Sequence, residues 1–232
     1  MTFDPTILAP YLPALAAGAR LTALACALAL AGGLVLGVVV ALLRASAAPL
    51  PRRLAGIYVD IFRNVPFIVQ LFFLFYGLPE IGVELDAFST GVLALSLAGG
   101  AFTSDVIRAG ILAIEPGVIE AAQVSGLSRR IVYQKIVLPI ALRTSVRPLG
   151  SVFVNLILTS SILSAITLNE LTGAAKIVAA DTFAPFEVYA LLLVAYVTLT
   201  YLVSLTAGAL HRRLNRQRIA ATPGPLATLG KG

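Results

Sequence analysis

The residues of this chain best suited to bind a small polar molecule lie within long apolar stretches. Asn155, Thr159 and Ser160 interrupt one such stretch, together with Ser161 and Ser164. Asn155 and Thr159 are four residues apart, so on a helix their side chains share one face. Polar side chains within apolar helices often mark a ligand pathway, but Ser and Thr also form hydrogen bonds between packed helices. Both interpretations remain open at this point.

Catalytic and metal-binding arrangements are not expected from the sequence. Neither Lys135, Lys176 nor Lys231 is followed by Ser or Thr in a glycine-rich loop, so there is no phosphate-binding P-loop. Cys26 and His211 are single residues of their types, too few for a zinc site. We therefore expect that this chain is not an enzyme, and that energy for its function comes from another chain or from an ion gradient.

The composition indicates a membrane protein. Of the 232 residues, 59% are hydrophobic and only 12% are charged, which is about half the charge content of soluble domains. A helix needs about 20 apolar residues to cross the core of a bilayer. We predict an all-α membrane protein with five transmembrane helices, at about 21–43, 56–79, 87–108, 146–169 and 188–210.

The distribution of basic residues predicts how these helices are oriented. Fourteen of the 17 Lys and Arg residues fall in 44–56, in 105–147 and after His211, which would all lie on one side of the membrane. Because Lys and Arg are enriched in cytoplasmic connections, we expect residues 1–20 to be extracytoplasmic and residues 214–232 to form a flexible cytoplasmic tail. The asymmetry accounts for the net charge of +6 without a nucleic-acid partner, and membrane lipid is the expected surrounding.

The connection between the third and fourth predicted spans is long and amphipathic. It runs over residues 105–147, and apolar residues recur in it at helical spacing. We expect two short helices joined at Gly126, the second beginning with Ser128 as its N-cap and ended by Pro139. Because an exposed apolar stripe needs a partner, segment 115–139 is predicted to form a docking knob in the cytoplasm.

The knob carries a set of residues at fixed spacing: Glu120, Ala121, Ala122, Gly126, Ile136, Leu138 and Pro139. This pattern resembles the EAA motif of ATP-binding-cassette (ABC) importer permeases at every signature position. Segments 62–71, 107–111 and 182–189 resemble the branch of that family that carries polar amino acids, the histidine–glutamine branch. The resemblance covers about residues 15–213, and it implies the permease fold of an ABC type I importer.

The resemblance also implies a set of partners. Two such permeases, the same or homologous, form the pathway in the inner (cytoplasmic) membrane of a bacterium. Each inserts its motif loop into one of a pair of cytoplasmic ABC ATPase subunits, which use ATP and Mg²⁺, whereas this chain is expected to bind no cofactor and no metal. An extracytoplasmic solute-binding protein delivers the solute. Glu120 and Gly126 are implied to hold this coupling loop, and Ala121 and Ala122 to permit close packing.

The chain departs from that branch at positions where a solute is expected to bind. Leu158 and Thr159 stand where the branch commonly has Lys-Asp, Ala98 stands where it often has Asn, and Asn169 replaces a proline. Without the aspartate, a neutral or acidic amino acid or a related small zwitterion is easier to accommodate than a cationic one. Alternatively, the second permease of a heterodimer supplies the polar site. The candidate pathway residues are Ala98, Asn155, Thr159 and Ser160.

A secondary transporter or channel driven by an ion gradient is the alternative function. Charged residues at mid-span or an internal repeat would favour it, and the sequence shows neither clearly.

Charged residues near the ends of the predicted spans suggest short-range pairs. Asp60 and Arg63 are three residues apart, as are Asp105 and Arg108, so each pair can neutralise itself on one helix. Glu170 is expected to be an exterior charge, available for contact with a solute-binding protein.

Overall fold

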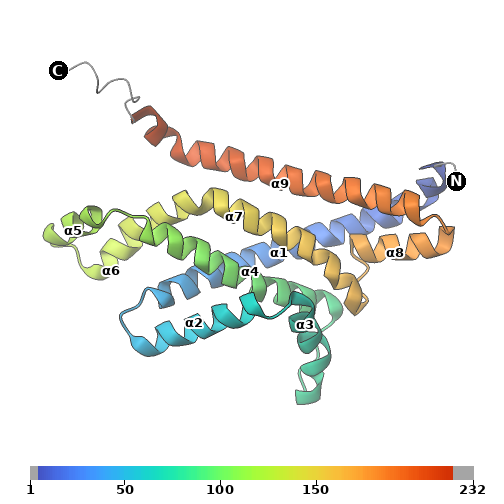
Figure 1. The fold of residues 1–232 in the computed structure, drawn as a ribbon, viewed down its shortest axis with the longest axis horizontal. Helices are drawn as coiled ribbons and strands as arrows, with labels where there is room; N and C mark the ends of the chain where they lie inside the picture. Colours follow the sequence, from blue (N-terminus) through green and yellow to red (C-terminus); the bar gives the residue numbers. More distant parts are fainter. Residues whose placement is uncertain (1–4, 222–232) are drawn as a thin grey trace.

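The computed structural model describes residues 5–221, and these form helices and short connections without a strand. The longer helices are α1 (Leu12–Arg44), α2 (Pro49–Asn64), α4 (Ala87–Leu112), α7 (Leu138–Ser160), α8 (Leu171–Thr182) and α9 (Pro185–Ala221). The shorter ones are η1 (Pro5–Tyr11), α3 (Phe67–Phe72), η2 (Phe73–Gly77), η3 (Pro79–Ile81), α5 (Pro116–Val124), α6 (Arg129–Val132), η4 (Tyr133–Val137) and η5 (Ser161–Ile166). Figure 1 shows an elongated bundle in which α1, α4 and α7 lie together, with α9 along one side and α2 along the other.

Among the residues that the structure describes, four helical segments are long and apolar enough to cross a membrane: Thr6–Arg44, Ala87–Leu112, Arg129–Ile166 and Pro185–Leu214. A bent pair raises this number to five if the pair acts as one span.

The predicted second span, 56–79, is not one straight helix. Its two halves, Pro49–Asn64 and Phe67–Ile81, are bent by 108°. The bend lies at Val65 and Pro66, where Val65 adopts an extended conformation with ψ of 132°. A proline disfavours the helical region for the residue before it and cannot donate a backbone hydrogen bond, which is the physical reason for the break.

The contact between α1 and α4 is very close. A Cβ atom on Gly37 would lie 2.4 Å from Cγ2 of Thr103, and one on Gly33 would lie 3.3 Å from the backbone nitrogen of Gly100. No side chain larger than hydrogen fits at Gly37 unless the helices move apart. Glycines spaced by four residues let two helices approach in this way, and the spacing of Gly33 and Gly37 in the sequence indicates such packing.

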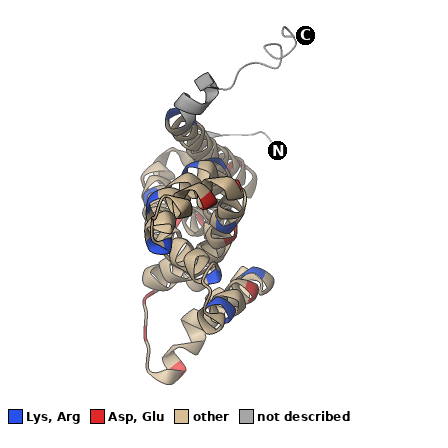
Figure 2. Cartoon of the chain, turned by 90° about the vertical axis from the view of Figure 1, so that its left-hand side faces the viewer, with Lys and Arg blue, Asp and Glu red and all other residues tan. Residues whose placement is uncertain are grey.

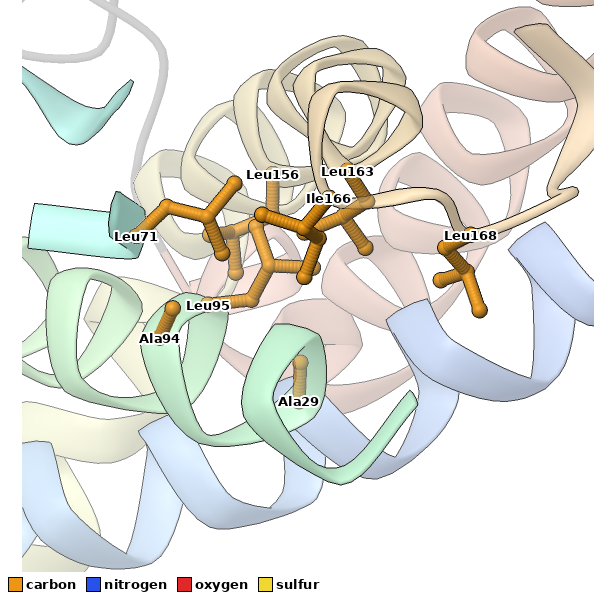
Figure 3. Close-up of a cluster of buried hydrophobic side chains, with 8 residues drawn as sticks. All are labelled: Ala29, Leu71, Ala94, Leu95, Leu156, Leu163, Ile166 and Leu168. Atoms are coloured by element: carbon orange, nitrogen blue, oxygen red, sulfur yellow. The ribbon is translucent and has the colours of Figure 1, made fainter. Parts of the chain in front are cut away.

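An apolar cluster joins these helices to α3 and to the segment after α7. Figure 3 shows Leu71, Leu95 and Leu156 pointing toward Leu163 and Ile166. All five side chains are buried. The cluster is the apolar contact between α7 and α4 at the end of the bundle opposite the docking knob.

Helix α8 was not predicted, and its N-cap, Glu170, is a buried residue rather than an exterior charge. The side chain of Glu170 is fully buried, and its carboxylate accepts hydrogen bonds from the backbone N–H groups of Thr172 and Gly173, each at 3.0 Å. The hydroxyls of Thr22 and Tyr196 donate to the same carboxylate at 3.1 and 3.2 Å. Glu170 therefore connects α1, α8 and α9.

Part of the predicted flexible tail, 214–232, is helical in the structure. Helix α9 continues to Ala221, and residues 222–232 lie outside the described residues, as do residues 1–4 of the predicted N-terminal segment.

We predict that Glu170→Gln destabilises the protein. The new amide nitrogen cannot accept the hydrogen bonds that the carboxylate accepts, and each unsatisfied buried donor costs about 1–3 kcal/mol. Thermal unfolding of the purified protein in detergent should show a clear fall in Tm. Asp181→Asn makes the same chemical change at an exposed position at the end of α8 and should leave Tm unchanged. Equal Tm values for both variants would contradict the structural role of Glu170.

Candidate functional site

The docking knob, segment 115–139, contains α5, a tight turn, α6, the π-helical turn η4 and the first residues of α7. Gly126 follows the end of α5 with a φ of +80°, a left-handed conformation that glycine adopts without strain. The N–H of Gly126 donates to the carbonyl of Gln123 at 2.9 Å, and that of Leu127 donates to the carbonyl of Ala122 at 3.3 Å. This pair of bonds is the Schellman arrangement that closes a helix C-terminus. The glycine predicted from the sequence is thus required by the turn itself.

The second helix of the knob starts as predicted but does not end as predicted. The hydroxyl of Ser128 accepts a hydrogen bond from the N–H of Ile131 at 3.4 Å, which makes Ser128 the N-cap of α6. Pro139, however, does not end this helix, because α6 continues through the π-helical turn η4 directly into α7. The prediction of a break at Pro139 is wrong. Pro139 lies directly after the π-helical turn, where the N–H of Leu138 donates to the carbonyl of Tyr133 and the pattern of backbone hydrogen bonds changes.

The inner side of the knob packs against the bundle. Ala122 is 7% exposed and belongs to a cluster with Ile107, Val132 and Ala141, and Ile136 packs against that cluster. Only a small side chain fits at position 122 without displacing these neighbours. Leu138 and Pro139 are half-buried at the start of α7.

The outer side of the knob is exposed. Glu120, Ala121 and Gly126 face solvent, and the side chain of Val124 is 89% exposed. A Cβ atom on Gly126 would have no neighbour within 4 Å. The knob therefore presents a carboxylate and a large apolar side chain to whatever binds it.

The second part of the site is a cavity of about 440 Å³ where the bend between α2 and α3 meets α4 and α7. The cavity is lined by three of the predicted pathway residues, Ala98, Asn155 and Thr159. Ser151 also lines it and lies on the same face of α7 as the two polar residues Asn155 and Thr159. Asn155 Oδ1 accepts a hydrogen bond from the hydroxyl of Thr159 at 3.3 Å. The structure thus brings together residues from two predicted spans.

The fourth candidate, Ser160, does not line this cavity. Its side chain is fully buried, and its hydroxyl donates to the carbonyl of Ile157 at 2.7 Å. One residue along a helix turns the side chain by about 100°, so Ser160 points away from the face that carries Asn155 and Thr159. Ser160 was predicted to line the pathway with the other three residues, and the helix geometry instead places it outside this cavity.

Sequence reasoning missed two polar residues of the cavity, Arg63 and Gln70. The side-chain nitrogen of Gln70 donates to the carbonyls of Phe62 and Val65 at 3.1 and 2.7 Å. These bonds cover carbonyl groups next to the break at Pro66. The signal in the sequence was a proline that breaks an apolar helix, followed four residues later by a glutamine.

Arg63 belongs to an ionic cluster that differs from the predicted one. Asp105 forms salt bridges with both Arg44 and Arg63, so the predicted pairs Asp60–Arg63 and Asp105–Arg108 are wrong. The guanidinium of Arg63 also lies 5.7 Å from the centroid of the Phe102 ring, within the range of a cation–π contact. Because α1, α2 and α4 converge at Asp105, this carboxylate pairs with arginines from two other helices and not with Arg108 on its own helix.

Comparisons with known proteins complete the description of the site. The family model described as "Binding-protein-dependent transport system inner membrane component" matches residues 33–216. The "Probable glutamine ABC transporter permease protein GlnM" of Bacillus subtilis (strain 168) is 37% identical over 195 residues, covering 84% of this chain and 90% of that protein. The "Glutamine transport system permease protein GlnP" of Escherichia coli (strain K12) is 30% identical over 216 residues, covering 92% of this chain and 99% of that protein.

The fold is also similar to that of a solved structure, described as "Crystal structure of an amino acid ABC transporter with histidines". The two chains superpose with a TM-score of 0.85 at 30% sequence identity, over 92% of this chain and 100% of the other.

We predict that Asp105→Asn destabilises the protein and that Asp60→Asn does not. Removing the carboxylate at position 105 leaves two arginines without a counter-charge, one of them, Arg44, only 16% exposed. Because the cluster is partly open to solvent, the expected cost is about 1–2 kcal/mol. Asp60 is exposed and forms no salt bridge among the described residues. The stability of each variant is measured by urea or thermal unfolding in detergent. Equal stability of the two variants would contradict the structural role of the Asp105 cluster.

Proposed function

This chain belongs to the family of binding-protein-dependent transport system inner membrane components, and from this premise we propose that its cavity carries a neutral polar amino acid. The chain is a translocation subunit of an ABC importer and a multi-pass membrane protein. Because the chain belongs to this family, the alternative function, a transporter driven by an ion gradient, is not retained. The substrate, the moving parts and the individual partners are argued below from the described residues.

The lining of the cavity supports the choice of substrate. Ser151, Asn155 and Thr159 form a polar stripe on α7, and Arg63 lies on the wall formed by α2. Arg63 is suited to bind the α-carboxylate of an amino acid, because a guanidinium donates hydrogen bonds in the geometry that a carboxylate accepts. The hydroxyl and amide groups of the stripe suit an uncharged polar side chain.

The charge balance of the cavity argues against a cationic substrate. None of the described residues that line it is acidic, and the carboxylate that forms a salt bridge with Arg63, that of Asp105, also pairs with Arg44. A lysine or arginine side chain would enter a low-dielectric space without a counter-charge, which is costly. The volume of about 440 Å³ is within the range of small-molecule sites. The polar stripe opposite Arg63 is the single observation that carries the proposal.

The continuous helix from α6 to α7 supports a route for coupling. Arg129 starts this helical path in the knob, and Asn155 and Thr159 lie near its other end in the cavity. An α-helix rises 1.5 Å per residue, so the path from Arg129 to Asn155 is about 39 Å long along the helix axis. We propose that a separate ABC ATPase binds the outer side of the knob and moves α6 and α7 as one body, which widens or narrows the cavity. In this proposal ATP and Mg²⁺ bind to that ATPase, and this chain contributes the helix α6–α7 that transmits the movement to the cavity.

The arrangement of charges supports the proposed orientation. The end of α1, the knob and the end of α9 lie at one end of the bundle, whereas α8 and the described N-terminal residues lie at the other (Figure 1). Figure 2 looks onto the knob end, where Lys and Arg occur on several helices. We propose that this end faces the cytoplasm of a bacterium, and that a solute-binding protein and a second permease complete the importer at the opposite end and along the bundle.

We predict that Thr159→Val and Asn155→Leu each lower uptake of glutamine, the probe substrate, by about five- to thirtyfold. Each change removes hydrogen-bonding capacity worth about 1–2 kcal/mol from the cavity. The measurement is ATP-dependent uptake of labelled glutamine into proteoliposomes that contain the complete importer. Thr198→Val, the same change at an exposed position on α9, should leave uptake unchanged.

Variants of the knob separate a defect of the cavity from a defect of coupling. Gly126→Val strains the left-handed turn, so it should release the co-purifying ATPase, whereas Thr159→Val should retain it. Unchanged uptake by the cavity variants, or uptake of labelled lysine as efficient as that of glutamine, would contradict the proposed substrate class.

A further inference from the structure

A separate groove of about 630 Å³ lies between α7 and α9 and shares only Ser151 with the substrate cavity. Its lining combines three basic residues, Arg147, His211 and Arg212, with Ser204 and with residues that have little or no side chain. Neither the coupling loop nor the substrate pathway uses these basic residues. The groove therefore requires its own explanation.

Helices α7 and α9 place Arg147 and Arg212 on the same side of the close contact between Gly150 and Ala207. Helices α7 and α9 run antiparallel (Figure 1), and they approach so closely that a Cβ atom on Gly150 would lie 2.7 Å from Cβ of Ala207. Arg147 precedes Gly150 by three residues, and Arg212 follows Ala207 by five. Because the helices are antiparallel, each arginine lies about one turn from the contact toward the knob end.

The guanidinium of Arg212 is directed back along its own helix into the groove. Its Nη1 atom lies 3.9 Å from the position that a Cβ atom on Gly208 would occupy. The missing side chain at position 208 leaves the floor of the groove open beside this cation. A bulky residue there would narrow the groove without touching the contact between Gly150 and Ala207.

The groove has cationic groups and no described acidic residue in its lining. The salt bridges of the described residues involve Asp105 and not Arg147 or Arg212. Two guanidinium groups across one groove favour an anion that both can bind, and phosphate oxygens match the donor geometry of arginine.

The position of the groove along the bundle distinguishes the kind of anion. Arg147 directly precedes the uncharged stretch 148–169, and Arg212 lies two residues before the end of the apolar segment Pro185–Leu214. This places both arginines at the level where lipid headgroups occur. Toward the middle of the bundle, Val154 lines the groove, and α9 exposes Leu202 and Leu205. The ligand that fits has an anionic head and an apolar tail. We propose that this groove binds an anionic phospholipid, with its phosphate between Arg147 and Arg212 and an acyl chain along α9.

Native mass spectrometry of the purified full-length chain, titrated with phosphatidylglycerol, tests this site. Each basic residue near a membrane surface contributes about 1 kcal/mol to the binding of anionic lipid, so the double variant Arg147→Gln/Arg212→Gln should weaken the first binding event by about tenfold or more. The matched control, Arg129→Gln/Arg130→Gln, removes the same charge from exposed positions in the knob and should change that affinity less than twofold. Phosphatidylcholine should bind equally to all three proteins.

Three results would overturn the proposal. Equal loss of phosphatidylglycerol binding in both double variants would mean that net charge, and not the groove, attracts the lipid. Displacement of the lipid by millimolar inorganic phosphate, with the same sensitivity to the two arginines, would identify a soluble anion as the ligand. Retention of the lipid by the single chain but not by the assembled permease pair would mean that the second subunit covers the groove.

Discussion

The continuous helical path from Arg129 to Ser160 is the constraint on which the rest of the structure depends. A helix in an apolar environment must satisfy its backbone groups internally, so it resists bending unless a side chain or a widened turn replaces the lost bonds. Here the π-helical turn Tyr133–Val137 comes directly before Leu138 and Pro139, where the ladder of hydrogen bonds already changes. The proline is thereby accommodated, and α6, the second helix of the knob, becomes part of the same helical rod that carries Asn155 and Thr159.

The other helices provide the frame against which this rod can act. Gly33 and Gly37 bring α1 so close to α4 that the two form one unit, and Asp105 ties α2 to that unit through Arg44 and Arg63. Glu170 connects α8 and α9 to α1 at the other end. The cavity lies between this frame and α7, so a movement of α7 would change the volume of the cavity.

The sequence predicts those features that depend on length, local spacing and turn chemistry. Apolar stretches indicate the membrane-crossing helices, the left-handed turn requires Gly126, and Ser128 caps α6 because its hydroxyl reaches an N–H three residues away. Features that depend on distant partners could not be predicted in this way. Glu170 is buried because it meets Thr22, a residue 148 positions earlier, and Asp105 binds two arginines from other helices.

The two prolines Pro66 and Pro139 show that even a local feature, a break in a helix, cannot always be predicted from the sequence. Pro66 breaks a helix sharply and Pro139 does not, although both lie in apolar surroundings. At Pro66 the preceding Val65 is extended, and Gln70 covers nearby carbonyl groups. At Pro139 the π-helical turn supplies the adjustment. Which outcome follows depends on what packs around the proline, and a single sequence does not specify that packing.

Spin-label distance measurements on the importer complex test the central claim most directly. Labels at Arg130→Cys in α6 and Leu158→Cys in α7, in a Cys26→Ala background, report on the rod; labels at Leu158→Cys and Ile57→Cys in α2 report on the cavity wall. With and without ATP, we expect the first distance to stay constant within about 2 Å, as a helix that moves as one body requires, and the second to change. A first distance that changes on ATP binding while the second stays constant would show that the helix bends between the knob and the cavity, and would contradict the account.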